Sequence, residues 1–444
     1  MSRFIILFSF AISCLSISVQ GQHPHEGMHH WEIPSQDPDR VILTFNGDPA
    51  TSRAVTWRTN TVVKKAVAQI AEATKNATFK ASALTVNAIT EQFDLGLYKS
   101  NVSLKVLYHN ALFTDLKPDT QYLYRVGDGE EHWSEWIRFR TAKADYAPTQ
   151  FVYFGDAQND VLEHWSRVIR LAYQTAPDAS FVIHAGDLIN NAHRDTEWAE
   201  WYKAGGFIHS HWTAIPVVGN HEFYSVVDGA PRQLSIQWRP QFTLPVEKEL
   251  EKELHETVYT VDYQDVRIIV LNSNHMLKEQ TSYLEEQLKN STARWKIITC
   301  HHSIFSPAKG RDFEFARENW KPLLDQYNVD LVLNGHDHTY ARGHVPVRRA
   351  ETDEEDRLGT IYVTSVSGPK QYALDTAQLI SYSKQGYRLD HSGEQTQFFQ
   401  VITAAENKLT YTAYTALGEV YDQAVIEKDF RTGRKKLVQS ISSE

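Results

Sequence analysis

Five short segments of the chain place oxygen and imidazole side chains directly after runs of strand-forming residues. In chain order these side chains are Asp156 and Gln158, Asp187, Asn220 with His221 and Glu222, His301 with His302, and His336 with His338. Carboxylates, amides and imidazoles are ligands of transition-metal ions. Two such ions, roughly 3.5–4 Å apart, can neutralise the charge that develops during phosphate-ester hydrolysis and can generate hydroxide near neutral pH. The segments therefore predict a two-metal site for this chemistry.

Each of these residues also has an ordinary structural explanation. Asp156 or Asp187 could cap the helix that follows it. Asn220 could hold a turn, and His336 or His338 could be a hydrogen-bonded residue of the core. For any single residue the ordinary explanation is preferred. The joint order and strand context of all five segments favour the metal site.

The elements that must position these side chains alternate between strand and helix. Strand-forming runs lie at 151–155, 181–186, 215–219, 295–300 and 329–335. Residues at helical spacing, or amphipathic stretches, lie at 161–172, 197–203, 282–289 and 319–327. This alternation predicts an α/β domain with strands buried on both faces. Ligands of such sheets bind beyond the carboxyl ends of the strands, where all five polar segments fall.

Residues 39–142 show a different pattern, with strand after strand and no helical periodicity. Within 116–126, a turn is followed by aromatic residues at period two, which is the period of a strand. We expect a small β-sandwich here, and the stretch 116–124 resembles a fibronectin type III domain. Residues 143–148 would link this sandwich to the α/β domain at 149–440.

Length and composition restrict the class of protein. A chain of 444 residues is too long for one ordinary core, which favours two domains. A hydrophobic fraction of 42% and a charged fraction of 23% are typical of a folded soluble protein. The net charge of −10 argues against a nucleic-acid partner, because no basic surplus is present to release counterions. A small anionic substrate remains compatible, since bound cations reverse the local potential.

The N-terminus is typical of a secretory signal peptide at residues 1–21. Its apolar run at 4–17 is shorter than the about 20 residues of a membrane-spanning helix. We therefore expect export, to the periplasm, the extracellular space or an acidic vesicle, and no membrane anchor. A polar, histidine-rich leader follows at 22–38. Cys14 lies in the signal, so Cys300 alone remains and no intramolecular disulfide can form.

At the five polar segments the chain resembles the calcineurin-like metallophosphoesterases, most closely their purple acid phosphatase-like branch. The resemblance covers about residues 39–440. It implies a four-layer α/β-sandwich metallophosphoesterase domain preceded by an all-β fibronectin type III-like sandwich. It also implies two metal ions per chain (Fe, Mn or Zn) and a small phosphate-ester substrate. The implied activity is secreted hydrolysis of phosphate monoesters through a metal-bound hydroxide.

The same resemblance implies a role for each residue. The ligands of the first metal would be Asp156, Asp187 and His338. The ligands of the second metal would be Asn220, His301, His336 and the bridging Asp187. His221 would contact the phosphate and protonate the leaving group.

Two positions depart from the family pattern. Purple enzymes carry a tyrosine that binds iron(III) shortly after the bridging aspartate, and here Asn190 or Asn191 stands in its place. A neutral amide stabilises a trivalent ion less than a phenolate does, so we expect no purple colour and a preference for Mn, Zn or ferrous iron. Gln158 stands where purple enzymes have Gly and other branches have a metal-binding His. It either ligates the first metal or lies behind the ligands.

Several neighbouring residues have two open interpretations each. Asn190 and His302 are either additional ligands or supporting residues, and packing explains His302 equally well. Arg311 is a candidate contact to the substrate phosphate, as are Tyr340 and Arg342. Solvated surface is the preferred interpretation of all three.

Three functions fit these observations. The leading one is a secreted dinuclear phosphatase. A phosphodiesterase or nucleotide-hydrolysing metallophosphoesterase would use the same site, because family members differ more in the walls of the cleft than in the ligands. A non-catalytic adhesion or metal-binding protein is the third, and the presence of all six ligand residues argues against it.

Overall fold

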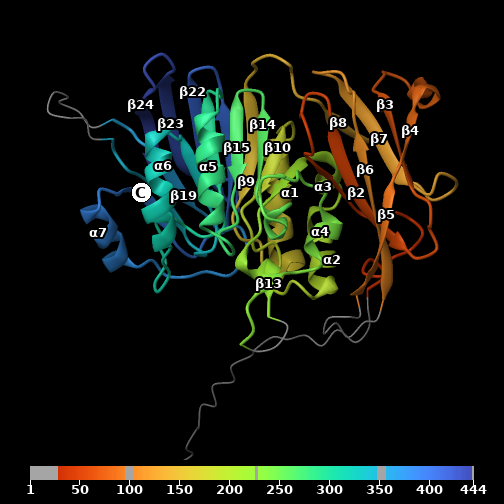
Figure 1. Cartoon of the computed structure of the whole chain (residues 1–444), viewed down its shortest axis with the longest axis horizontal. Coiled ribbons are helices and arrows are strands. Elements are labelled where there is room, and N and C mark those ends of the chain that lie inside the picture. The colour runs from red at the N-terminus through yellow and green to blue at the C-terminus, as the bar shows by residue number, and fades with distance from the viewer. Residues whose placement is uncertain (1–28, 96–103, 226–228, 348–356, 443–444) are drawn as a thin grey trace, which may run out of the picture.

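The structure is a computed structural model that describes residues 29–95, 104–225, 229–347 and 357–442. The predicted signal peptide and much of the leader lie outside the described residues. The described strands form sheets of eleven, seven, four and two strands (Figure 1).

The eleven-stranded sheet runs through both halves of the chain, in the order β24-β23-β22-β21-β9-β10-β11-β1-β2-β6-β5. Its strands are β1 (Asp39–Thr44), β2 (Arg53–Asn60), β5 (Ile89–Asp94), β6 (Lys105–Phe113), β9 (Thr149–Phe154), β10 (Phe181–His184), β11 (Thr213–Pro216), β21 (Phe398–Ala404), β22 (Lys408–Thr415), β23 (Val420–Asp429) and β24 (Arg434–Ser442). The junction lies between β1 and β11, which pair in parallel through Leu43 and Thr213. One continuous sheet therefore joins the N-terminal sandwich to the α/β domain.

A seven-stranded sheet packs against the α/β part of the first, in the order β14-β15-β16-β17-β19-β18-β20. Its strands are β14 (Tyr259–Tyr263), β15 (Val266–Val270), β16 (Trp295–Thr299), β17 (Leu331–Asn334), β18 (Tyr340–His344), β19 (Ile361–Thr364) and β20 (Arg388–Gly393). Successive side chains of a strand point to opposite faces. In β15, Ile268 packs toward the first sheet and Ile269 packs toward the helices. The strand is buried on both faces, as the sequence predicted.

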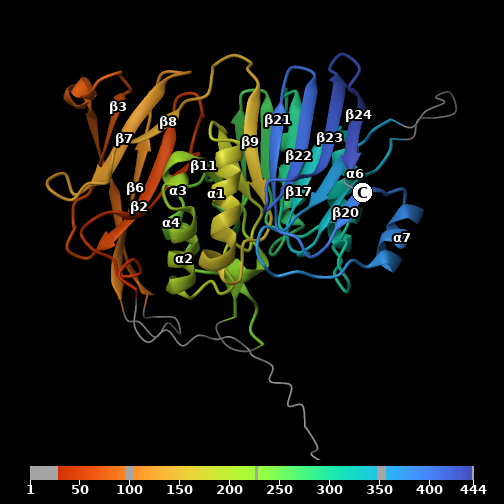
Figure 2. The same ribbon diagram turned by 180° about the vertical axis from the view of Figure 1, so that it is seen from behind.

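Helices cover the outer faces of the two sheets. The helices are α1 (Ser166–Thr175), α2 (Asp195–Gly205), α3 (Phe207–His211), α4 (Trp238–Gln241), α5 (Glu279–Lys289), α6 (Lys321–Gln326) and α7 (Thr376–Lys384). Short 3-10 or π-helical turns are η1 (Ala77–Ser82), η3 (Val161–Trp165), η4 (Asn220–Glu222), η5 (Lys252–Leu254) and η6 (Ala316–Trp320). α5 and α6 lie in front of the second sheet in Figure 1, and α1, α2 and α3 lie on the opposite side, in front in Figure 2. The predicted four-layer α/β fold is confirmed.

The helices predicted at 197–203, 282–289 and 319–327 are present, but they begin and end at other residues than predicted. The stretch 197–203 is part of α2, 282–289 is part of α5, and 319–327 coincides mainly with η6 and α6. None of the helices among the described residues is long and apolar enough to span a bilayer.

The N-terminal β-sandwich has two layers. A four-stranded sheet packs against the end of the large sheet that is formed by β1, β2, β6 and β5. This small sheet has the order β4-β3-β7-β8, with β3 (Val67–Glu72), β4 (Leu84–Asn87), β7 (Gln121–Gly127) and β8 (Ile137–Arg140). Trp57 of β2 and Tyr124 of β7 are both 0% exposed in the core between the sheets. The sandwich predicted from aromatic residues at period two is confirmed as a fold. Its likeness to fibronectin type III stays a prediction.

Parallel strands bring the five polar segments to one edge of the molecule. β9, β10 and β11 run parallel, with Val152, Val182 and Ala214 in register. β16 and β17 of the second sheet are also parallel. The loops after these strands meet at the lower edge in Figure 1, near the β12 (Phe223–Tyr224) and β13 (Gln233–Leu234) hairpin. This edge carries the candidate site.

Candidate metal centre

The first group of candidate ligands comes from three loops at this edge. Asp156 follows β9, Asp187 follows β10, and His338 follows β17. One donor atom from each lies within 4.8 Å of the other two. Asp156 Oδ2 lies 3.4 Å from His338 Nε2. All three side chains are buried, and two buried carboxylates require a compensating positive charge.

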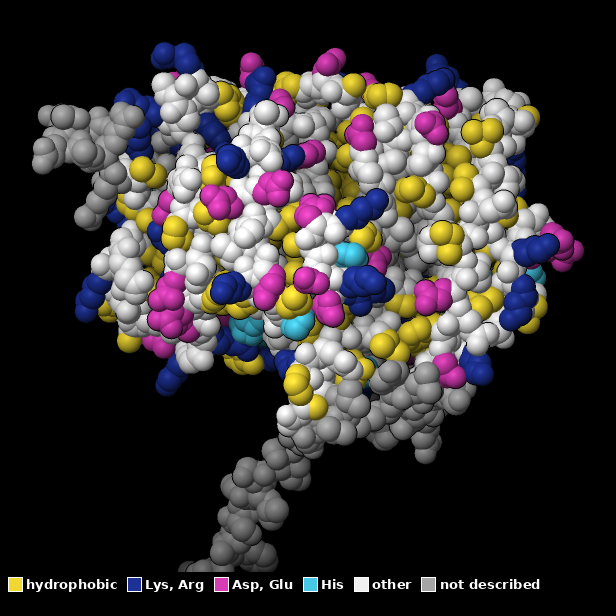
Figure 3. Space-filling model, in the orientation of Figure 1, with side chains coloured by type: hydrophobic (Ala, Val, Ile, Leu, Met, Phe, Trp, Pro, Cys, Tyr) yellow, Lys and Arg dark blue, Asp and Glu magenta, His cyan; other side chains and the backbone are white. Residues whose placement is uncertain are grey.

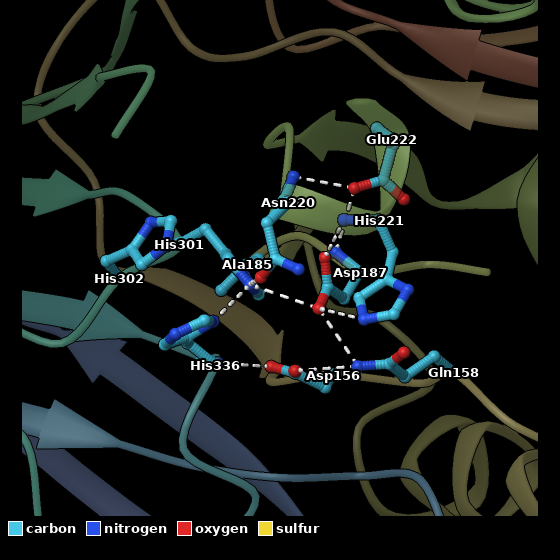
Figure 4. A network of polar contacts seen from close by, with 12 residues as sticks. Asp156, Gln158, Ala185, Asp187, Asn220, His221, Glu222, His301, His302 and His336 are labelled. Atoms are coloured by element: carbon cyan, nitrogen blue, oxygen red, sulfur yellow. Dashed lines mark hydrogen bonds and ion pairs between the residues drawn. The ribbon is translucent and has the colours of Figure 1, made fainter. Parts of the chain in front are cut away.

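The second group consists of Asp187, His301 and His336, with the amide of Asn220 beside them. His301 Nε2 lies 3.2 Å from Asp187 Oδ2, and 3.1 Å from both Asn220 Oδ1 and His336 Nδ1. The other ring nitrogen of His301 hydrogen-bonds the carbonyl of Ala185 at 2.9 Å. His301 therefore turns Nε2 toward the group, as Figure 4 shows.

These donor atoms fit a pair of cations. Asp187 belongs to both groups, and its Oδ2 is the atom that His301 approaches, while Oδ1 accepts the backbone N–H of His221 at 2.8 Å. Two ligands at about 2.1 Å from one ion in octahedral geometry lie roughly 3 Å apart. The donor–donor distances of 3.1–3.4 Å agree with that spacing. Oxygen and imidazole donors of this kind suit Fe, Mn or Zn.

Two glycines allow the loops to approach so closely. Gly186 has a φ of +90°, and a Cβ there would lie 2.6 Å from His301 Nδ1. A Cβ at Gly219 would lie 2.1 Å from Asp187 Oδ1. Any larger residue at either position would displace a candidate ligand. This explains locally why glycine precedes both Asp187 and Asn220.

Burial and neighbouring charges shift the pKa values of several candidate ligands. Burial lowers the pKa of His338 to about 2 and lowers the pKa of His336 still further, so both rings are neutral and carry lone pairs. Burial, together with the charge of Asp187, raises the pKa of Asp156 to about 7. Burial disfavours charge on His301, yet Asp187 and Asp156 raise its pKa to about 9. The carboxylates therefore stabilise positive charge at the place that a cation would take.

Glu222 fixes the loop that carries Asp187. Its carboxylate is 0% exposed and accepts backbone N–H groups from Asp187 at 3.0 Å, Leu188 at 2.8 Å and Gly219 at 2.6 Å. Burial, and next the Asp187 carboxylate, raise the pKa of Glu222 to about 8. The sequence analysis named Glu222 without giving it a role. Its signal was an acid placed directly after two polar residues at a strand end.

His221 lies at the opening of the site. Its side chain is 26% exposed, and Nε2 lies 3.9 Å from Asp187 Oδ2. Nδ1 contacts the backbone carbonyl of Asn190 at 2.6 Å, while the backbone N–H of Asn190 donates to Glu197 at 2.7 Å. Asn190 thus orients His221 through its backbone, and these contacts give no support to Asn190 as a metal ligand.

His302 lies beside the second group rather than in it. Ser273 Oγ contacts its Nδ1 at 2.8 Å, and its ring centroid lies 4.1 Å from that of His336. Burial lowers the pKa of His302 to about 3. These contacts favour a supporting role for His302, behind His336.

Basic side chains surround the donor groups. Arg311 donates to the backbone carbonyl of His336 at 2.6 Å, and its guanidinium lies 4.8 Å from the ring centroid of Tyr372. The Lys370 ammonium lies 5.6 Å from the same ring. Arg232 donates to the backbone carbonyl groups of Asn220 and of Phe223. Among the described residues none of these three cations forms a salt bridge.

The sequence pointed to Arg311 but not to Lys370, Tyr372 or Arg232. Their segments carry no motif, and only the fold brings them to the site. The prediction that Tyr340 or Arg342 contacts the substrate phosphate was wrong. Both are 0% exposed, and both donate to Asp422, at 2.6 Å in each case. Their side chains lie between the two sheets, not in the cleft.

Two family models match the chain. The model described as Purple acid Phosphatase, N-terminal domain, matches residues 38–141, and the model described as Calcineurin-like phosphoesterase matches residues 149–340. An uncharacterized protein of Mycobacterium tuberculosis is 27% identical over 346 residues, which is 69% of this chain and 62% of that protein. Acid phosphatase type 7 of Homo sapiens is 26% identical over 344 residues, 70% of this chain and 71% of the human protein. The chain thus spans less than two thirds of the mycobacterial relative.

A solved structure supports the same fold. The purple acid phosphatase from yellow lupin (Lupinus luteus) seeds has a TM-score of 0.73 and 20% sequence identity, covering 90% of this chain and 76% of the lupin chain. At this identity the similarity concerns the fold alone.

The fold, the two ligand groups and the family models together define a domain of the metallophosphoesterase class with a candidate metal centre. Within that class the chain belongs to the purple acid phosphatase-like branch of the calcineurin-like family, because its N-terminal sandwich also matches the domain model of that branch. The predicted family is confirmed. The role of each site residue stays a prediction.

Proposed function

We propose that this protein is a secreted phosphatase that hydrolyses small phosphate monoesters with two metal ions. The observation that carries the proposal is the pair of buried donor groups that share Asp187. The first ion would be held by Asp156, Asp187 and His338, and the second by Asp187, Asn220, His301 and His336. When bound, the two ions would neutralise phosphoryl oxygens and would lower the pKa of a water molecule. Fe, Mn and Zn all suit these donors.

His221 is the proposed proton donor to the leaving group. The Asn190 carbonyl accepts a hydrogen bond from Nδ1–H, so a second proton on the ring resides on Nε2. That atom lies 3.9 Å from Asp187 Oδ2, on the side of the ring that faces the donor groups (Figure 4). A histidine placed in this way can protonate an alkoxide as the ester bond breaks.

The basic side chains around the site support a monoester substrate. Arg311 and Arg232 donate to the backbone carbonyls of His336 and Asn220. The Lys370 ammonium lies 5.6 Å from the ring centroid of Tyr372, whose ring centroid lies 4.9 Å from that of His338. All three cations therefore lie near the donors. A phosphate monoester carries two negative charges near neutral pH, and a diester carries one. Extra cations therefore stabilise a monoester more than a diester.

The rest of the surface agrees with a small substrate. On the face shown in Figure 3, basic and acidic side chains are interspersed, with no continuous basic band among the described residues of that face. Secretion rests on the apolar N-terminal run of the sequence, which lies outside the described residues.

The test is hydrolysis of p-nitrophenyl phosphate and bis(p-nitrophenyl) phosphate by protein purified without chelator. We expect a higher kcat/KM for the monoester, and loss of both activities in His301→Ala. A higher kcat/KM for the diester would replace the proposal with a phosphodiesterase. No hydrolysis by metal-loaded protein would support the non-catalytic alternative.

A further inference from the structure

The side chain of Gln158 reaches into the first donor group. Its Nε2 lies 2.9 Å from Asp187 Oδ2, 3.0 Å from His338 Nε2 and 3.4 Å from Asp156 Oδ2. These are the spacings of neighbouring ligands around one ion, roughly 3 Å. The amide group of Gln158 is therefore a fourth member of the first donor group, which otherwise consists of two carboxylates and one imidazole.

The backbone holds this side chain in place. The N–H groups of Ala157 and Gln158 both donate to the carbonyl of Asp187, at 3.2 and 3.1 Å. On the other side a Cβ at Gly368 would lie 2.7 Å from the carbonyl oxygens of Ala157 and Gln158. The loop is fixed between these two segments. The side chain of Gln158 is therefore already ordered before a ligand binds.

One polar atom of Gln158 has no hydrogen-bond partner. The residue is 0% exposed, and its Oε1 is buried without a donor. A buried unpaired acceptor costs about 1–3 kcal/mol. The nitrogen and oxygen of an amide have nearly the same size, so a half-turn about the last side-chain bond exchanges them in place. After that half-turn, Oε1 takes the position from which Nε2 now faces Asp187, Asp156 and His338.

The charge of the site determines which orientation is stable. Without a cation, the N–H groups of the amide face the two carboxylates. With a cation among Asp156, Asp187 and His338, the same position favours an oxygen, because a carbonyl oxygen is a ligand and an N–H group is repelled.

We propose that Gln158 is a ligand of the first metal ion through Oε1, and that this neutral donor adapts the site to a pair of divalent ions. The inference rests on the proposed two-metal function. It adds Gln158 to the ligands of the proposed function, beyond the carboxylates and imidazoles of the two donor groups. Because an amide adds no negative charge, the site favours a divalent ion over a trivalent one more than an anionic oxygen in the same place would.

The test is equilibrium binding of Mn²⁺ to metal-free protein, measured from the electron paramagnetic resonance of free Mn²⁺. Wild type is expected to bind two ions per chain. Gln158→Met keeps the length of the side chain but removes the oxygen, and it should weaken binding of one ion by at least about tenfold. Gln158→Glu restores an oxygen and removes the N–H donor, and it should bind both ions at least as tightly as wild type.

The matched control is Gln241→Met. Gln241 of α4 is also 0% exposed, and its Oε1 also has no partner, but it lies outside both donor groups. Its substitution should leave Mn²⁺ binding unchanged. Near-ultraviolet circular dichroism shows whether each variant is folded.

Two results would overturn the inference. Wild-type binding by folded Gln158→Met would show that the oxygen is not a ligand. Binding by Gln158→Glu as weak as that of Gln158→Met would show that the N–H groups matter instead. If Gln158→Met does not fold, Gln158→Glu decides alone: weaker binding than wild type contradicts the inference, and equal or tighter binding supports it. Failure of wild type to bind two ions would instead contradict the proposed function itself.

Discussion

Replacing His221 by Gln tests whether this residue protonates the leaving group, because the substitution should affect catalysis far more than it affects stability. The side chain is 26% exposed and makes one hydrogen bond, to the Asn190 carbonyl at 2.6 Å. Loss of that bond should reduce the free energy of unfolding by only about 1 kcal/mol. Loss of a general acid should slow the reaction by about 10²–10⁴-fold, which corresponds to roughly 3–5 kcal/mol in the activation free energy. The catalytic effect should therefore greatly exceed the effect on stability.

The assay compares two esters with different leaving groups. An alkyl phosphate releases an alkoxide that must be protonated, whereas p-nitrophenyl phosphate releases a phenolate that is stable without a proton. We expect His221→Gln to lose most of its kcat on the alkyl ester and much less on the nitrophenyl ester. The matched control is His255→Gln, because His255 is another half-buried histidine held by a backbone carbonyl, that of Leu250 at 3.0 Å. An equal loss on both esters would refute the assignment of His221 as a proton donor.

Three further predictions concern the fold that supports the site. Asp330 is buried against Lys428 at 2.8 Å and Lys435 at 3.4 Å, so Asp330→Ala should lower the free energy of unfolding in urea by about 3–5 kcal/mol; a change below about 1 kcal/mol would contradict this. Burial lowers the pKa of Lys435 to about 8 from its ordinary 10.5. Between these pH values the folded state binds fewer protons than the unfolded chain, so the free energy of unfolding should rise with pH. Lys435→Met should reduce this dependence of the free energy of unfolding on pH. Gly219→Ala places a Cβ 2.1 Å from Asp187 Oδ1 and should lower the metal content measured by elemental analysis; wild-type content would show that the loop adapts.

The sequence predicted that these polar side chains gather at one edge, because strand ends have a local signature. Runs of β-branched and aromatic residues before Asp156, Asp187 and Asn220 determine three parallel strands, and parallel strands present their carboxyl ends at the same edge. The order of the polar residues then brings the two groups together. His336 and His338 come from one short loop, and the structure places them in different groups.

Features that depend on long-range pairing could not be predicted. β1 pairs with β11 across the two halves of the chain, and no local pattern specifies that partner. Tyr340 and Arg342 follow the histidine loop in sequence and therefore suggested the cleft. In a strand, however, residues two apart share a face, and here that face points to Asp422 between the sheets. Lys370 and Tyr372 reach the site only through the fold.

The most direct test of the two-metal account is the metal content of protein purified without chelator, measured by elemental analysis. Histidine-rich segments such as the leader at 22–38 can bind metal on their own. The control is therefore Asp187→Ala, which keeps the leader and removes the shared ligand. The account predicts about two more ions per chain in wild type than in the variant, with the corresponding hydrolysis of phosphate monoesters. Equal metal content in the two proteins, unchanged after incubation with Mn, Zn or Fe, would contradict it.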